Sequence, residues 1–362
     1  MQSTSAVPAR FETLPPSLPS SFADVERMAA WLASPAVRDR DGMLRSWCNP
    51  RRPGYRYAEA TGYAVRGWLD LHRRSGERRW LAEARRSAEA LFEAMDPATG
   101  AFGRGEHLYA FDTAVCASAL LDATTIEGGA SAARLALVRR ALDFVAGCLA
   151  RGVGSIRRED GRPPSGPERW SHAFGPHLIK SVAVLAKARA RGVSWDCEVD
   201  LGRVARELCE RSFDGSGFRI PGPDAAVYLH SHCYAVEGML ELERAGYAPS
   251  HATRGTVVAG TAWLAARQGP DGAVPRWWGR PGDSADRAAD ATAQAVRLWC
   301  VVDPDRFRDN VERGLEFIGQ LGDSSGGVRY TPEHDDLNSW TTVFAMQAHL
   351  LNRFGPGTDS IA

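Results

Sequence analysis

Lysine is almost absent from this chain: among its 44 basic residues, only Lys180 and Lys187 are lysines. Acidic residues also number 44, so neither charge is in excess and the formal net charge is zero. Nothing therefore attracts a polyanion from a distance, and no basic run carries interleaved aromatic residues, which argues against nucleic acid as a partner. The preference for arginine over lysine is typical of a coding bias.

Long apolar runs are missing too. No stretch approaches the roughly 18 uncharged apolar residues of a membrane-spanning helix, so we expect no membrane contact. Residues 1–20 are rich in serine and proline but lack the basic start and apolar run of a signal peptide, so we expect a flexible segment of a cytoplasmic protein. The seven cysteines are odd in number, scattered and without a Cys-x-x-Cys pair, which predicts reduced thiols.

Cofactor fingerprints are equally scarce. Neither a Gly-x-Gly-x-x-Gly segment after a strand nor a P-loop lysine motif is present, so we predict no cofactor. His232, Cys233 and Asp290 are the alternative candidates for metal ligands, but their spacing matches no zinc motif and we predict no metal. The hydrophobic content of 44% is nevertheless ample for a large buried core.

What the sequence does have is a repeated turn. Each copy is a polar segment with a glycine at a position suited to positive φ, followed by an apolar residue. The copies are residues 96–102, 214–218, 268–274 and 323–328, with a degenerate fifth at 152–156. Two segments of helical period lie between successive turns, which gives a repeat of roughly 55–60 residues.

Two kinds of helix alternate between these turns. Segments 80–95 and 310–321 are apolar on one face and charged on the other, which is typical of helices on the outside of a protein. The segments after the turns are apolar on most faces and must be buried. These buried segments are 63–71, 113–123, 181–188, 234–242, 291–302 and 341–351. With residues 21–32 as the first outer helix, the count closes at six and six.

This alternation predicts an all-α fold, an (α/α)6 toroid of six helical hairpins with inner and outer rings. One domain would span residues 21–355, leaving 356–362 as a tail; an open α-solenoid is the alternative. The pattern resembles the toroids of six-hairpin glycosidases and terpenoid cyclases over nearly the whole chain. Within that group, YAEATGY at 57–63 and LNSW at 337–340 are loosely similar to segments of the catalytic toroid of glucuronyl C5-epimerases.

Polar and aromatic side chains gather just before the buried helices. In a toroid the starts of the inner helices meet at one mouth, where helix N-termini favour anionic groups. Aromatic rings stack on sugar faces, while polar and arginine side chains bind hydroxyls or a uronate carboxylate. We therefore predict substrate contacts from Trp47, Arg52, Tyr57, His107, Trp170, His172, His230, Trp278, Asn338 and Trp340.

Chemistry on a sugar needs a general acid and a general base. Hydrolysis uses paired carboxylates, whereas proton abstraction beside a carboxylate uses Tyr, His or Glu. The candidate catalytic residues are Glu59, Asp112, His232, Glu237, Asp290 and Asp336. The favoured function is a carbohydrate-active enzyme, a hydrolase, lyase or epimerase, that takes a sugar, oligosaccharide or uronic-acid-containing substrate in a central funnel. The oligomeric state is left open.

Two other functions stay open. The acidic motif around Asp336 resembles that of terpenoid cyclases, which would make Asp336 the acid of a cyclase with an apolar, aromatic funnel. A non-catalytic toroid that binds a partner through its rim would lack an enclosed pocket and perturbed carboxylates or histidines. Single residues also have structural interpretations: Asp290 suits a helix cap, while His230 and Glu237 suit a buried hydrogen-bond chain.

Overall fold

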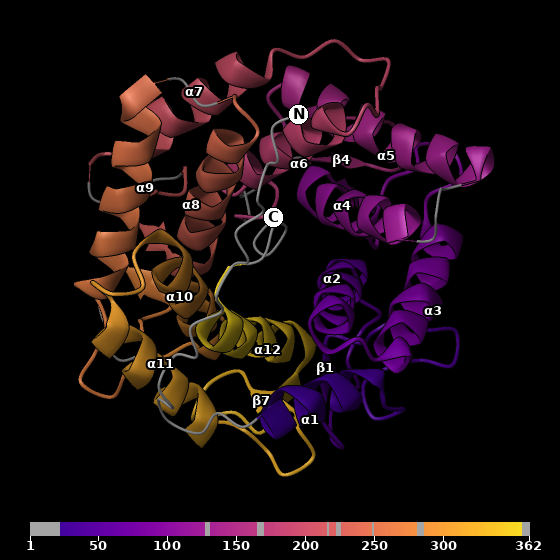
Figure 1. Cartoon of the computed structure of the whole chain (residues 1–362). Coiled ribbons are helices and arrows are strands. Elements are labelled where there is room, and N and C mark those ends of the chain that lie inside the picture. Colours follow the sequence, from indigo (N-terminus) through magenta and orange to yellow (C-terminus); the bar gives the residue numbers. More distant parts are fainter. Residues whose placement is uncertain are drawn as a thin grey trace, which may run out of the picture.

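The computed structural model describes residues 22–126, 131–164, 170–215, 217–221, 226–247, 250–280 and 286–356. Within these ranges twelve α-helices form a closed double ring (Figure 1). The inner ring consists of α2 (Ala58–Ser75), α4 (Ala110–Ile126), α6 (Leu178–Ala190), α8 (Leu229–Arg244), α10 (Ala289–Val302) and α12 (Ser339–Phe354). The outer ring consists of α1 (Phe22–Ala33), α3 (Arg78–Ala94), α5 (Ala132–Ala150), α7 (Leu201–Ser212), α9 (Ser250–Ala265) and α11 (Arg308–Gln320). The predicted N-terminal segment 1–20 and the tail beyond residue 356 lie outside the described residues.

The ring closes where its first and last helices meet. Helix α12 packs against both α1 and α2, and residues 47–48 pair with residues 337–338. An open solenoid has no such contact between its ends. The predicted (α/α)6 toroid is therefore confirmed.

Inner helices differ from outer ones as the sequence predicts. Helix α4 buries every residue from Ala110 to Thr124, whereas α3 buries one face through residues such as Trp80 and Leu91. All seven cysteines are free thiols. No helix in the described ranges combines the length and apolarity needed to cross a bilayer.

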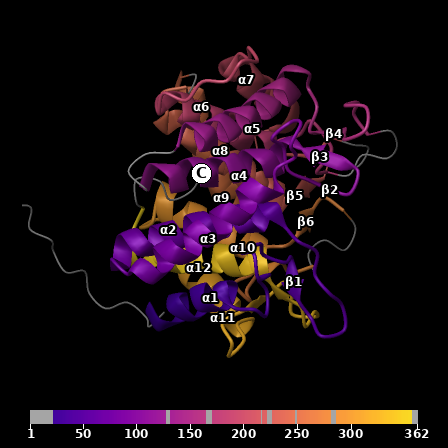
Figure 2. The same ribbon diagram turned by 90° about the vertical axis from the view of Figure 1, so that its right-hand side faces the viewer.

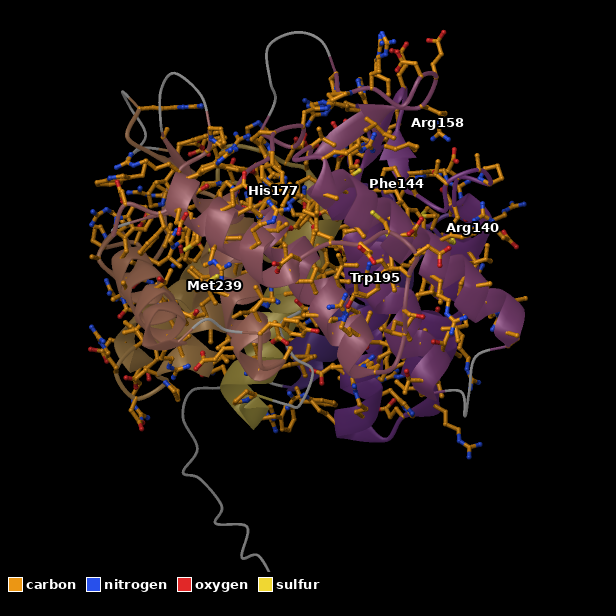
Figure 3. The ribbon with its side chains drawn as sticks, turned by 90° about the horizontal axis from the view of Figure 1, so that it is seen from above. Arg140, Phe144, Arg158, His177, Trp195 and Met239 are labelled. Carbon is orange, nitrogen blue, oxygen red and sulfur yellow. The ribbon has the colours of Figure 1, made fainter. Side chains whose placement is uncertain are left out.

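The strands are short and gather on one side of the toroid (Figure 2). Within the described residues none exceeds three residues. They form the sheets β1 (Trp47–Cys48)–β8 (Leu337–Asn338)–β7 (Val328–Arg329), β2 (Gly103–Arg104)–β3 (His107–Tyr109)–β4 (Ser155–Arg157), and β5 (Val227–Tyr228)–β6 (Trp277–Trp278). The inner helices begin on this side, so His177 lies toward the side of Arg158, and Met239, late in α8, lies toward the other (Figure 3).

The repeated turn is anchored in the same way in four hairpins. The predicted positive φ is present, for example +84° at Gly272, where a Cβ would lie 2.1 Å from the carbonyl oxygen of Arg313 in the outer helix. The apolar residue after the glycine is buried, and its N–H donates to the threonine at the fourth position of the next inner helix. These pairs are Leu44 with Thr61, Phe102 with Thr113, Val274 with Thr292 and Val328 with Thr342, at 2.9–3.0 Å. Each bond ties a turn to the start of an inner helix.

Candidate active site

Three layers of equivalent positions surround the axis of the inner ring, and in α6 the side chain that reaches the axis is that of the third residue, Lys180. The layers consist of the second, sixth and ninth residues of each inner helix, because spacings of four and three residues place side chains on one helix face. The first layer is Glu59, Phe111, Ile179, His230, Asp290 and Trp340. The second is Tyr63, Val115, Ala183, Tyr234, Gln294 and Phe344, and the third is Arg66, Ser118, Ala186, Glu237, Arg297 and Gln347.

Contacts between opposite helices show that these layers meet at the axis. Tyr234 of α8 donates a hydrogen bond of 3.0 Å to Glu59 of α2, across the ring. The rings of Tyr63 and Tyr234 also lie parallel, with centroids 6.2 Å apart. The starts of the inner helices therefore converge, as predicted, and bring residues distant in sequence into contact.

Glu59 is the carboxylate around which the first layer is arranged. Its oxygens accept hydrogen bonds from the hydroxyls of Tyr57 and Tyr234, and the residue is only 5% exposed. Burial, reinforced by the nearby carboxylate of Asp112, raises the pKa of Glu59 to about 7. A carboxyl group that titrates near neutral pH can serve as a general acid or a general base.

Asp112 faces an arginine that is held among aromatic rings. Nε of Arg104 lies 3.5 Å from Oδ2 of Asp112. The guanidinium lies 5.2 Å from the ring centroid of Tyr57 and 4.7 Å from that of Tyr109, and it donates to the hydroxyl of Tyr55 at 3.3 Å. Burial raises the pKa of Asp112, and the charge of Arg104 opposes this rise. The starts of α2 and α4 thus combine acidic groups, a cation and aromatic faces.

A histidine–carboxylate pair lies on the other side of Tyr234. Oδ2 of Asp290 is 3.4 Å from Nδ1 of His230 and accepts a hydrogen bond of 3.2 Å from the indole nitrogen of Trp340. The ring of His230 packs edge-on against Tyr234, with centroids 4.4 Å apart. Burial lowers the pKa of His230, and the charge of Asp290 opposes this effect. The site therefore has a second group able to transfer a proton.

An aromatic cluster borders this pair. The ring of Trp170 lies 5.3 Å from His177, 5.1 Å from Tyr228 and 6.1 Å from His230, as centroid distances. Tyr228 in turn stacks on Trp277 at 4.6 Å. Burial, with a smaller contribution from His230, lowers the pKa of His177 to about 3, so His177 is neutral at physiological pH. The half-buried rings of Trp170 and Trp277 suit the apolar face of a sugar.

The structure places His232 away from the site, which corrects its prediction as a catalytic residue. Its Nδ1 accepts the N–H of Phe218 at 3.0 Å, and its Nε2 lies 3.1 Å from the carbonyl of Gly260 in α9. His232 is the fourth residue of α8, so it replaces the threonine that anchors the turn in other hairpins. Burial lowers its pKa to about 4. With both nitrogens bonded, His232 has a structural role, and the described residues hold no group of three or more metal-ligating side chains.

Glu237 and Asp336 also lie outside the first layer. Glu237 is fully buried in the third layer, 2.6 Å from Nζ of Lys180 and 3.0 Å from Nη1 of Arg297. Asp336 forms an ion pair with Arg52 beside the β1–β8 pairing that closes the ring. Both predicted catalytic carboxylates are thus held in ion pairs, and we assign them structural roles.

Of the predicted substrate contacts near the ring closure, one reaches the first layer and the others lie on the rim or have a structural role. Arg52 lies over the ring of Trp47, with its guanidinium carbon 5.0 Å from the centroid, and both belong to the rim. Asn338 is 2% exposed and caps α12 by accepting the N–H of Thr341 at 3.0 Å. Trp340 is the member of this group that reaches the first layer, where its ring meets that of Tyr57.

His107 of β3 and His172, in the segment before α6, lie together beside the β2–β3–β4 sheet, next to the arginine of the site. Their ring centroids are 4.7 Å apart. Nδ1 of His172 is 2.8 Å from the hydroxyl of Ser155, and its Nε2 is 3.4 Å from the hydroxyl of Tyr109. Tyr109 also contacts Arg104. The His107–His172 pair therefore lies at the edge of the site and outside its first layer.

Of the two neighbouring tryptophans in β6, the prediction selected the one that faces outward. Trp278 is 37% exposed and packs against Trp263 of α9 and against Arg267. Trp277 points the other way and stacks on Tyr228. Successive side chains of a strand alternate between its faces, so only one of the two can face the site.

Two site arginines, Arg104 and Arg276, were not predicted, although a pattern in the sequence marks them. An arginine follows the buried apolar residue of every turn, and the six are Arg45, Arg104, Arg157, Arg219, Arg276 and Arg329. In four hairpins the arginine follows the buried apolar residue directly. In three of these four the arginine forms an ion pair with an aspartate of the same loop, as Arg219 does with Asp214. Gly103 and Pro275 each add one residue, so Arg104 and Arg276 turn to the other side, toward tyrosine rings.

No protein-family profile matches the chain, and no curated protein matches it in sequence. Solved structures do match its fold. A cellobiose 2-epimerase from Bacillus thermoamylovorans superposes with a TM-score of 0.70 at 11% identity, over 90% of this chain and 98% of that one. An unsaturated glucuronyl hydrolase specific for heparin gives a TM-score of 0.67 at 11% identity, over 91% and 96%.

An α-1,6-mannanase from Salegentibacter sp. gives a TM-score of 0.61 at 11% identity, over 91% of this chain and 99% of that one. Identities this low establish the fold alone. The chain has the (α/α)6 toroid fold, as the sequence predicts; its resemblance to glucuronyl C5-epimerases stays a prediction.

Proposed function

We propose that the chain is a carbohydrate-active enzyme that works by general acid–base catalysis at Glu59. The observation that carries this proposal is a buried carboxyl group with a pKa near 7, held by two tyrosine hydroxyls among aromatic rings. The names of the three structural neighbours, an epimerase and two glycan hydrolases, support a sugar as substrate. In this proposal Glu59 exchanges the first proton and the His230–Asp290 pair the second.

The grouping of charges favours this function over the two alternatives. A cyclase would need Asp336 as a free acid, but Asp336 is ion-paired to Arg52. A toroid that only binds a partner gives no reason for a carboxyl group with a raised pKa beside a histidine–carboxylate pair. Asp112 and Glu59 together offer the two acidic groups of a hydrolase, whereas Glu59 and His230 offer the two proton-transfer groups of an epimerase.

Isotopic labelling of the product separates these reactions. Turnover of a panel of neutral and uronic-acid disaccharides in D2O places deuterium on carbon if a C–H bond is broken and re-formed, as in epimerisation. Turnover in H2¹⁸O places ¹⁸O in a product hydroxyl if a glycosidic bond is hydrolysed. A lyase product gains a carbon–carbon double bond, visible by ultraviolet absorption. An absence of turnover across the panel, together with an absence of binding, would contradict the proposal.

Sugar binding should depend on Trp170 and be independent of Trp278. Trp170→Ala removes an aromatic face beside His230, so we expect the dissociation constant of a disaccharide ligand to rise about tenfold or more. Trp278→Ala is the matched control, because its ring packs toward α9. Titration calorimetry on both variants measures the effect. Equal affinities of the two variants would argue against a sugar site beside Trp170.

A further inference from the structure

Lys180 lies at the centre of the toroid, one layer below Glu59. It is the third residue of α6 and is only 1% exposed. Its Nζ is 2.6 Å from Oε2 of Glu237 and 5.0 Å from the ring centroids of both Tyr63 and Tyr234. Tyr234 is the residue whose hydroxyl donates to Glu59. A single tyrosine thus connects the buried ammonium group to the proposed catalytic carboxyl group.

The packing of α6 makes this position available to a lysine. The second- and third-layer residues of α6 are Ala183 and Ala186, which leave room beside the axis. Gly238 lets α8 approach closely, since a Cβ there would lie 2.5 Å from the backbone nitrogen of Lys180. The only lysines of this arginine-rich chain, Lys180 and Lys187, both belong to α6 and both pair with acids inside the ring. A compact ammonium group fits where the fork of a guanidinium would need more space.

We propose, building on the proposed function, that Lys180 is a positioning residue: it holds Tyr234 against Glu59 and supplies buried positive charge that favours the ionised form of Glu59. An ammonium group near an aromatic ring is attracted to its π-electrons, which orients the ring. The same charge withdraws electron density from the phenol and makes its hydroxyl a stronger donor. Preorganised charges of this kind act strongly where water is excluded.

The other charged groups near Lys180 do not cancel its positive charge. Glu237 of α8 is shared between Lys180 and Arg297 of α10, so two cations surround one carboxylate. Arg66 of α2 adds a further positive charge that reaches Lys180. Burial lowers the pKa of Lys180 to about 8, with Glu237 opposing and Arg297 adding to this effect.

The groups that face Glu59 come from several elements. Asp112 of α4 disfavours its ionised form, whereas Arg104 of β2 favours it. The hydroxyls of Tyr57 and of Tyr234 also favour the ionised form. The contribution of Lys180 through Tyr234 is thus measured against a constant background, provided that these groups stay intact in every variant.

The two lysines allow a direct test. In protein labelled with ¹³Cε-lysine, NMR observes two lysine resonances, and Lys187→Met identifies which one belongs to Lys180. We expect Glu59→Gln to lower the pKa of Lys180 by about 0.5 to 1 pH unit, because a negative charge is removed, and to leave Lys187 unchanged. A titration of Lys180 that is identical with and without the Glu59 charge would overturn the proposal.

The reciprocal variant tests the same coupling from the other side. Lys180→Met leaves Glu237 paired with Arg297 and should raise the pKa of Glu59, which ¹³C-carboxyl NMR and the pH profile of turnover both measure. Lys187→Met is the control, because Asp122 remains in ion pairs with Arg66 and Arg191 in that variant. If Lys180→Met fails to fold, the lysine titration in Glu59→Gln still decides.

The two proposals fail separately. Coupling between Lys180 and Glu59 in a protein whose Glu59→Gln variant retains turnover would refute the proposed function and keep this inference. An inactive Glu59→Gln variant in which Lys180 titrates normally would do the reverse.

Discussion

Replacing Glu59 by glutamine should reduce kcat about 10²- to 10⁴-fold and leave substrate affinity nearly unchanged. The amide oxygen can still accept from one of the two tyrosine hydroxyls, and the amide NH2 can donate to the oxygen of the other. The shape of the site is therefore kept, but the amide exchanges no proton at neutral pH. Steady-state kinetics on a substrate from the disaccharide panel measures the loss. Glu207→Gln on the outer helix α7, where Glu207 pairs with Arg211, is the matched control.

The pH profile gives a second readout of the same variant. Because the pKa of Glu59 is about 7, turnover by the wild-type enzyme should change steeply near pH 7, and this inflection should vanish in Glu59→Gln. A variant that keeps most of the turnover, or the same inflection, would show that another group transfers the proton.

Glu59→Gln should also stabilise the folded protein at pH 8. A carboxyl group whose folded pKa is raised above its ordinary 4.5 destabilises the fold as pH rises past 4.5, and the effect is complete above about pH 7. Glutamine removes this cost, so we expect a higher Tm than wild type at pH 8 and little difference at pH 4. Such a gain in stability with a loss of activity is typical of a catalytic group held in an unfavourable environment.

Replacing Asp122 by asparagine should lower the free energy of unfolding by about 3–5 kcal/mol, the largest effect on stability that we expect. Asp122 of α4 is 3% exposed and lies 2.9 Å from Nε of Arg66, 3.1 Å from Nζ of Lys187 and 2.5 Å from Nη1 of Arg191. Without the carboxylate these three cations face one another inside the ring. Chemical denaturation measures the loss.

The pH dependence of this loss follows from the charges. Burial alone would raise the pKa of Asp122, but Lys187, Arg66 and Arg191 together hold it well below its ordinary 3.8. The stabilisation is therefore complete above about pH 4 and declines as pH falls further. The gap between wild type and variant should be constant from pH 5 to 8 and should narrow in acid.

Asp305→Asn is the control for this variant, since the side chain of Asp305 is 89% exposed and pairs with Arg308 at the surface. We expect it to change stability by less than about 0.5 kcal/mol. Equal stabilities of the Asp122 and Asp305 variants would mean that the three cations find other partners.

The number and order of helices could be predicted because glycine-containing turns and apolar helical segments repeat along the chain. The starts of the inner helices could not: α2 begins at Ala58 rather than residue 63, and α6 at Leu178 rather than 181. The first turns of these helices carry polar residues such as Glu59, which look like loop when only apolar periodicity is followed. The active-site residues lie in those turns.

The wrong predictions within the site concern which of two nearby residues faces the axis. His230 and His232 are two residues apart on a helix and point about 200° apart, so only one can face the axis. Trp277 and Trp278 divide in the same way on a strand. A pair of like residues this close in sequence indicates that one of them faces the site. The pair alone does not show which of the two it is. The layer pattern along all six helices resolves this, once the helix starts are known.

The closure of α1 against α12 has a consequence for synthesis on the ribosome. Trp340 and α12, the last helix of the ring in chain order, are translated some 280 residues after Glu59. Until α12 emerges, the nascent chain exposes the apolar flanks of α2 and α10 that α12 covers in the finished protein. The growing polypeptide is therefore exposed to aggregation until α12 has been made, and no shortened chain that ends before α12 can assemble the proposed catalytic layer.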